Sequence, residues 1–68
     1  MQHKGYSIST RVVEDHWVAE IRRMDGKDFT FDGTTTPNFT TKRAVTSDDA
    51  EELAFQAIDS GMIAPVSA

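Results

Sequence analysis

The chain has 68 residues, no cysteine and a formal net charge of −4 at pH 7. This length holds one small domain, residues 1–68, and the absence of cysteine excludes disulfides and zinc–thiolate sites. No stretch approaches the length of a membrane-spanning helix, and no apolar leader stands near residue 1, so we expect a cytoplasmic protein that does not bind membranes.

The charges are unevenly divided along the chain. All seven Lys and Arg residues precede residue 47, together with six acidic residues, which gives this part a formal +1. Residues 48–68 hold five acidic residues and no Lys or Arg, a formal −5. Nucleic-acid binding requires clustered basic side chains that neutralise phosphates. The pattern therefore predicts an electrically two-ended domain and disfavours a nucleic-acid partner.

Two segments near the N-terminus alternate between apolar and polar residues. The period of two in residues 6–13 and 16–24, with its β-branched content, predicts two half-buried strands. Their short connection predicts a hairpin, and loops of two or four residues give the same register. The expected opposite pairs are Val12 with Trp17 and Ile8 with Ile21.

A third strand is expected at residues 28–32, after a turn that contains Asp25-Gly26. A two-residue loop would place Phe29 and Phe31 on the charged face of the sheet. A three-residue loop that ends at a left-handed Gly26 moves both rings to the apolar face, so we prefer this bulged turn. It predicts three further opposite pairs: Ile21 with Phe29, Ala19 with Phe31, and Arg22 with Asp28.

The Thr-rich residues 32–41 indicate a loop or an irregular crossing. Residues 39–45 are compatible with a short fourth strand at the edge of the sheet, an alternative that the pattern leaves open. The clearest helix spans residues 46–61, capped by Thr46 or Ser47 and closed at Gly61. Its apolar positions form one stripe with helical spacing: Ala50, Leu53, Ala54, Ala57 and Ile58.

These elements predict an α+β domain of the order β-β-β-α. A three- or four-stranded antiparallel sheet carries the C-terminal helix on one face. We expect residues 1–4 and 64–68 to be frayed. The alternation places Trp17 in the core, and adjacent Arg22 and Arg23 point to opposite faces of their strand, which prevents them from forming one binding fork.

Three motifs carry a resemblance to a known family. "YSI" at residues 6–8, "WVAEI" at residues 17–21 and "TSDDAEELAFQAI" at residues 46–58 are similar to the N-terminal domain of HicB-type antitoxins. Small uncharacterised bacterial β-β-β-α proteins share the pattern. The middle of the chain departs from it, so the resemblance implies the fold, and an antitoxin-like regulator as one alternative, but no functional residue.

We predict no catalytic, cofactor or metal site and therefore a non-enzymatic protein. His16 beside Asp15 lies in a turn with no nucleophile at a suitable spacing, and His3 and His16 do not have metal-ligand spacing. The leading hypothesis is a protein-interaction module that forms a homodimer, since a thin core and an exposed strand edge favour self-association. The candidate interface residues are Phe39, Thr41, Arg43, Phe55, Met62 and Ile63. The alternative is nucleic-acid or anion binding through Arg11, Arg22, Lys27, Lys42 and Arg43.

Overall fold

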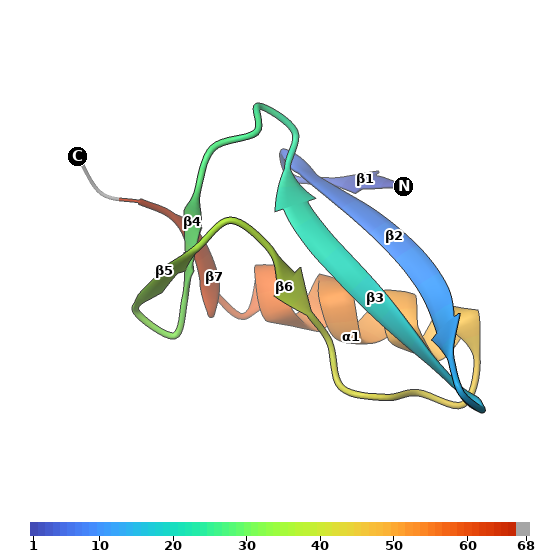
Figure 1. Cartoon of the computed structure of the whole chain (residues 1–68). Helices are drawn as coiled ribbons and strands as arrows, with labels where there is room; N and C mark the ends of the chain where they lie inside the picture. The colour runs from blue at the N-terminus through green and yellow to red at the C-terminus, as the bar shows by residue number, and fades with distance from the viewer. Residues whose placement is uncertain (67–68) are drawn as a thin grey trace.

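A computed structural model describes residues 1–66. One helix and seven strands follow one another along the chain (Figure 1). The strands and the helix are β1 (Gln2–His3), β2 (Tyr6–Val13), β3 (His16–Arg23), β4 (Phe29–Phe31), β5 (Thr34–Thr36), β6 (Phe39–Thr40), α1 (Ser47–Asp59) and β7 (Ile63–Pro65). This arrangement confirms the α+β class and the C-terminal helix.

The strands form two small antiparallel sheets instead of one. The first has the order β1-β2-β3-β6, and the second has the order β5-β4-β7. The helix packs against β2 and β3 of the first sheet and reaches β7 of the second. Because β5 and β6 are separated only by Pro37 and Asn38, the chain passes directly from the second sheet back into the first (Figure 1).

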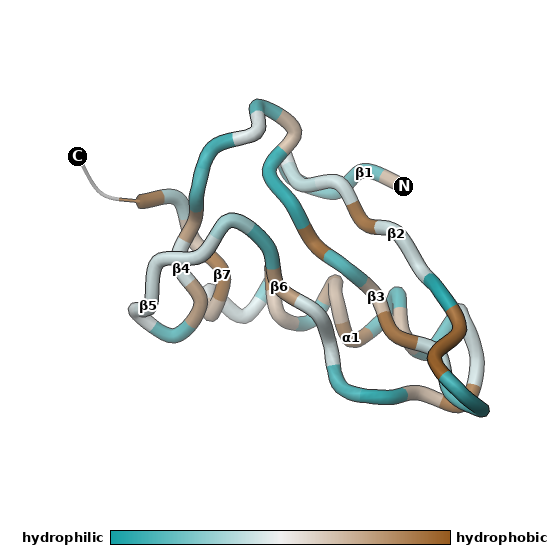
Figure 2. The backbone as a smooth tube through the Cα atoms, viewed as in Figure 1, coloured by the Kyte–Doolittle hydropathy of each residue, from teal (hydrophilic) through white to brown (hydrophobic). Residues whose placement is uncertain are grey.

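The β2–β3 hairpin has the predicted register throughout. Val12 lies opposite Trp17 and Ile8 lies opposite Ile21, within eight consecutive pairs. Figure 2 shows hydrophilic and hydrophobic residues alternating toward the C-terminal end of β3, whereas the adjacent Val18 and Ala19 are both buried. Turn residues with a positive φ, such as Glu14 at 56°, allow the two-residue connection whose twist suits a hairpin.

The predicted pairing of the third strand with β3 is wrong. Phe29 lies opposite Thr36 and Pro65 in the second sheet, while the edge of β3 pairs with β6 through Ile21 and Phe39. The expected contact between Arg22 and Asp28 is therefore also absent from the described residues. Arg22 donates to its neighbour Glu20 at 2.9 Å.

A second hairpin, β4–β5, explains this difference. Asp32 and Gly33 have φ values of 50° and 83° and join Phe31 directly to Thr34. Two successive left-handed residues form the turn typical of two-residue hairpins. The Thr-rich segment, expected as a loop, supplies strand β5, and the possible fourth strand is confirmed as β6, only two residues long.

The apolar core lies between the first sheet and α1. Its fully buried large side chains are Ile8, Ile21 and Phe29. Ala50, Ala54 and Ile58 of the predicted helical stripe face this core, whereas Leu53 and Ala57 are half-buried at its margin. Trp17 packs against the core but is only partly buried, so it lies at the edge of the core.

The ends of the helix match the predicted signals. The Thr46 hydroxyl accepts a hydrogen bond from the backbone N–H of Asp49 at 3.1 Å, and Gly61 follows the helix with a φ of 85°. Residues 1–4 and 64–68 were expected to fray, but His3 pairs with Tyr6 in the first sheet and Ala64 pairs with Thr30 in the second. Residues 67 and 68 of the expected frayed end lie outside the described residues.

Candidate functional site

A concave surface of the described residues runs between α1 and the segment from β5 to Val45. It consists of three adjoining open hollows, which we call together the α1–β6 groove. The first hollow, about 350 Å³, is lined by Ala44, Val45, Asp49, Glu52, Leu53 and Gln56. The middle hollow, about 370 Å³, is lined by Phe31, Phe39, Thr41, Lys42, Leu53, Gln56, Ala57, Ser60 and Met62. The third hollow, about 340 Å³, is lined by Phe31, Asp32, Thr34, Thr36, Asn38 and Phe39.

Shared side chains make the three hollows continuous. Leu53 and Gln56 line both the first and the middle hollow, and Phe31 and Phe39 line both the middle and the third. Three of these four shared side chains are apolar, so apolar side chains continue from one hollow to the next. Each hollow has a volume in the range of small ligand pockets, about 300–1,000 Å³, and the series suits an extended partner better than a compact one.

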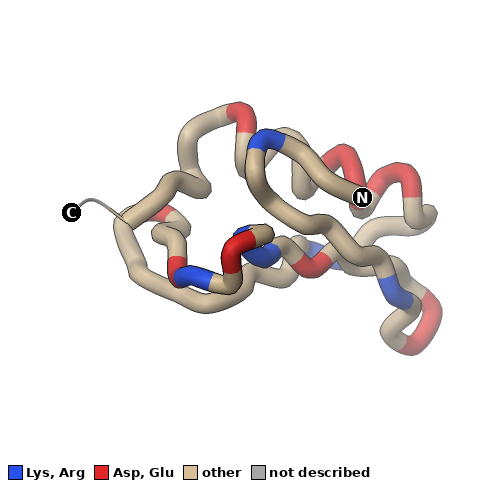
Figure 3. Tube along the Cα trace, turned by 90° about the horizontal axis from the view of Figure 1, so that it is seen from above, with Lys and Arg blue, Asp and Glu red and all other residues tan. Residues whose placement is uncertain are grey.

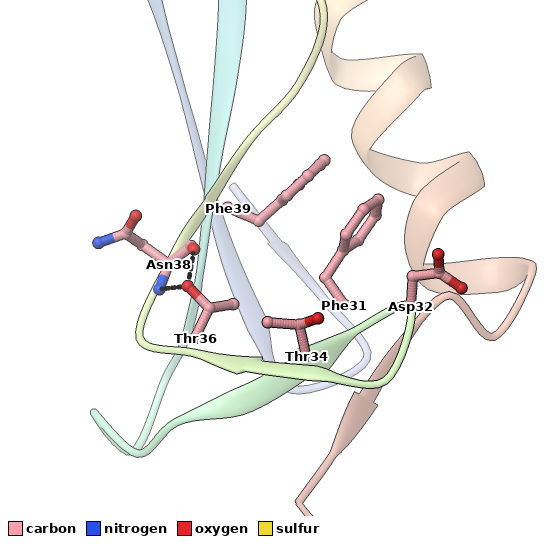
Figure 4. Close-up of a pocket in the computed structure, with 6 residues that line it drawn as sticks. All are labelled: Phe31, Asp32, Thr34, Thr36, Asn38 and Phe39. Atoms are coloured by element: carbon pink, nitrogen blue, oxygen red, sulfur yellow. Dashed lines mark hydrogen bonds between the residues drawn. The ribbon is translucent and has the colours of Figure 1, made fainter.

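Two phenylalanines divide the groove. The rings of Phe31 and Phe39 stack with centroids 4.0 Å apart and an interplanar angle of 18°. Figure 4 shows both rings side by side, leaning from their strands toward α1. The Asp32–Gly33 turn reverses the chain after Phe31, and the register of β6 places Phe39 beside Ile21. The two short strands thus bring both rings to one surface.

Thr41 fixes the wall of the middle hollow. Its side chain is 7% exposed, accepts a hydrogen bond from the Ala19 backbone N–H at 3.0 Å, and donates one to the Lys42 carbonyl oxygen at 3.1 Å. Regular pairing between β3 and β6 ends just before this point, and the chain next pairs at Trp17 and Ala44. The Thr41 hydroxyl therefore substitutes for a backbone partner where the strand leaves the sheet.

Each of the three hollows of the groove is lined by one or two charged residues. Lys42 is the only charged residue that lines the middle hollow, and it forms no ion pair within residues 1–66. Asp49 and Glu52 line the first hollow, at the N-terminal part of the helix, and Asp32 lines the third hollow. Figure 3 shows that acidic residues follow the helix without any basic residue among them.

The structure distributes the predicted interface residues over different environments. Phe39 and Met62 line the groove, with Met62 45% exposed. Ile63 is buried in the core and Thr41 is buried in the groove wall, so neither has a free side chain for a partner. Phe55 packs on His3, with ring centroids 4.7 Å apart. Arg43 is exposed, and its guanidinium nitrogen Nη1 lies 4.0 Å from Oε2 of Glu14.

The predicted anion-binding residues do not form one patch. Arg43 lies near Glu14 at the β2–β3 turn. Arg22 lies toward the other end of the hairpin, opposite Ser7 in the strand register. Arg22 is also paired with Glu20, and Lys27 lies in the turn between β3 and β4. Arg11, on β2, lies opposite Val18. Because phosphate binding depends on clustered positive charge, this arrangement gives the anion-binding alternative no support.

Sequence reasoning missed several groove residues; among them, Phe31 and Leu53 were assigned to the core, and Val45 was assigned to a possible edge strand. The signal for Phe31 was present in Asp32-Gly33, a dipeptide typical of two-residue hairpins. A prediction that used this dipeptide would have paired β4 with β5. The edge of β3 would then have been available for pairing with β6. Leu53 was less accessible to prediction, since a helical stripe does not reveal how far the opposing sheet extends.

A cluster of titratable groups lies on the other side of the helix. The Asp59 carboxylate accepts from Lys4 Nζ at 2.7 Å and contacts His3 Nε2 at 2.9 Å. These hydrogen bonds, first from Lys4 and then from His3, lower the pKa of Asp59 below its ordinary value of 3.8. The cluster joins the N-terminal strand to the end of α1, so we interpret it as a structural contact.

Two other groups have shifted pKa values. Burial raises the pKa of the Tyr6 hydroxyl, which has no hydrogen-bond partner within the described residues. The backbone N–H of Lys27 and the guanidinium of Arg23 lower the pKa of Asp25, with the Lys27 hydrogen bond the larger cause. Neither group lines the α1–β6 groove. No group of three or more metal-ligating side chains occurs in residues 1–66.

Comparisons with models of protein families, with curated protein sequences and with solved structures gave no significant match. The resemblance to HicB-type antitoxin domains therefore stays a prediction. Within the described part of the chain, no helix is long and apolar enough to cross a membrane. The functional argument rests on the geometry of the groove.

Proposed function

We propose that the protein is a non-enzymatic protein-interaction module and that it binds its partner in the α1–β6 groove. One observation carries this proposal: adjoining hollows along one side of the helix share the half-buried apolar side chains Leu53, Phe39 and Phe31. Concave sites lined by hydrophobic and aromatic side chains with a few polar groups are common binding sites in proteins. We place the module in the cytoplasm, since a chain without cysteine suits a reducing compartment.

Recognition would use the groove in a defined way. Apolar side chains of a partner segment would enter the hollows on either side of Leu53 and of the Phe31–Phe39 pair. Aromatic and aliphatic anchors that fill such pockets dominate the energy of most interfaces. The unpaired outer edge of β5 lies beside the third hollow and offers backbone groups to an extended segment.

Two methionines provide a matched test. Met62 lines the middle hollow and is 45% exposed, whereas Met24 lies in the turn after β3, away from the groove, and is 52% exposed. Peptides selected from a displayed random library against the full chain, immobilised at low density, are the probe. We expect Met62→Glu to weaken the selected peptides at least about 10-fold and Met24→Glu to change their affinity less than about 2-fold.

The measurement is fluorescence anisotropy with labelled peptides, after circular dichroism has shown that both variants fold. Peptides that bind both variants equally would place the binding surface elsewhere and contradict the proposal. So would a library that yields no peptide above the background of an unrelated protein.

A further inference from the structure

The charges beside the groove select one kind of partner. Lys42 stands in the middle hollow without an ion pair among residues 1–66, and Asp49 and Glu52 line the adjoining first hollow. Leu53, which lines both hollows, separates the positive from the negative side. These two hollows therefore present an unpaired cation and a pair of anions around Leu53, and one further anion, Asp32, lies in the third hollow beyond the Phe31–Phe39 pair.

We infer that the occupant of this surface is a second copy of the chain, bound about a two-fold axis near Leu53. A two-fold rotation exchanges the two sides of a surface, so a patch with a cation on one side and anions on the other complements itself. Lys42 of each copy then lies opposite Glu52 and Asp49 of the other. The inference rests on the proposed binding role of the groove and names the partner.

The apolar part of the patch supports the same arrangement. Val45 is 78% exposed beside the first hollow, and Met62 is 45% exposed beside the middle hollow. The two-fold axis brings the exposed Val45 of one copy toward the far side of Leu53 in the other. The dimer thus covers apolar side chains that the monomer leaves in water, and burial of such surface is the main favourable term in association.

A different protein would have to reproduce this charge order independently. It would need an anion for Lys42 and cations for Asp49 and Glu52 at matching positions, with apolar side chains between them. The second copy meets these requirements with residues already described. Electrostatic complementarity of this kind mainly determines which partner is accepted, which favours the copy over a partner with unrelated charges.

Sedimentation equilibrium of the full chain over low to high micromolar concentrations tests the inference. We expect a monomer–dimer equilibrium for the natural chain. Lys42→Glu should raise the dimer dissociation constant at least about 10-fold, because each dimer then has two repulsive contacts in place of two attractive ones. Glu52→Lys should weaken the dimer in the same direction, and the double variant should restore much of the affinity.

The matched control is Lys27→Glu, which changes the net charge by the same amount at an exposed lysine outside the groove. It should alter the dissociation constant less than about 3-fold. A natural chain that stays monomeric at high micromolar concentration would overturn the inference. A dimer equally weakened by Lys27→Glu and Lys42→Glu, or a double variant no better than the single variants, would also overturn it.

The oligomeric state and the binding of selected peptides together distinguish the homodimer inference from the proposed interaction module. A monomeric chain that still binds selected peptides in a Met62-dependent way would refute the second copy and retain the interaction module. A monomeric chain that binds no such peptide would refute both.

Discussion

The β2–β3 hairpin and the segment from Phe29 to Val45 build their strands in opposite ways. The hairpin pairs two strands of eight residues in one unbroken register. The second segment divides its residues among three short strands in two sheets and then leaves the sheet at Thr41. The regular region contributes Tyr6, Ile8, Ala19 and Ile21 to the core, and the irregular region contributes Phe29 to the core and forms one side of the groove.

The difference shows where binding surface arises in so small a domain. A long hairpin satisfies its own backbone groups and buries one face against the helix, so little of that face is left for a partner. The short strands β4, β5 and β6 change direction every few residues. This brings Phe31 and Phe39 to the surface and opens the space between them and α1. Function is therefore expected in the region with less regular pairing.

The largest effect is expected at the residue that joins the two regions. Phe29 is 0% exposed, belongs to β4, and its ring contacts that of Tyr6 on β2 with centroids 5.5 Å apart. Phe29→Ala should destabilise the protein by about 3–5 kcal/mol. This is a large part of a total of roughly 3–10 kcal/mol for a chain of this size, so we expect much of the population to unfold. Urea denaturation followed by circular dichroism measures the change.

The matched variant is Phe39→Ala, at a half-buried ring of the groove. It should cost about half as much, since less apolar surface leaves water on folding at this position. Amide hydrogen exchange then shows whether the regions unfold together. Protection of the β2–β3 amides that survives loss of the β4 amides in Phe29→Ala would show two independent units and contradict a single core.

The sequence predicted the regular region well and the irregular region poorly, for a physical reason. Alternation in residues 6–13 and 16–23 and a short turn specify one register, because a slip of one residue moves every apolar side chain to the other face. For Phe29, alternation specifies only which face is apolar. It does not specify which strand lies beside it, and β3 and β7 both satisfy the pattern. The choice depends on residues far along the chain, which local periodicity does not report.

The candidate site was predicted only in part, for the same reason. Phe39 and Met62 were identified because their apolar side chains had no assigned place in the predicted core. Ile63 was selected by the same reasoning, and Thr41 was selected as part of the possible edge strand, but core packing occupies Ile63 and a buried hydrogen bond occupies Thr41. Prediction of the groove itself requires the relative positions of α1 and β6. These elements are separated in the sequence and come together only in the folded chain.

A smaller effect is expected at the junction between β3 and the irregular segment. Thr41→Val keeps the shape of the side chain but removes the hydroxyl that pairs with the buried Ala19 N–H. An unsatisfied buried donor costs about 1–3 kcal/mol, so urea denaturation should show a loss of this size. Thr41→Ser retains the hydroxyl and should lose less. Equal stability of Thr41→Val and the natural chain would show that the strand leaves the sheet without this bond.

The smallest effect on stability is expected at the contact between α1 and β1, the strand that pairs with β2 of the regular region. The Lys4 and His3 hydrogen bonds lower the pKa of Asp59 below 3.8, so its ionised form is favoured in the folded protein. A lowered folded-state pKa contributes stability above the unfolded-state value, and this contribution is lost as the pH falls through the folded-state value. Asp59→Asn should therefore be less stable than the natural chain near about pH 7, by a small amount because the pair is solvent-exposed and screened by salt.

Thermal unfolding at a series of pH values measures this difference. We expect the two proteins to converge as the pH falls below about 4, where Asp carboxylates take up protons. Asp28→Asn is the control, at an exposed aspartate without an ion pair in residues 1–66, and should leave the unfolding temperature unchanged. A difference for Asp59→Asn that persists undiminished near about pH 2 would show that it comes from packing of the side chain. In that case β1 would be attached to the helix mainly by the contact of His3 with Phe55.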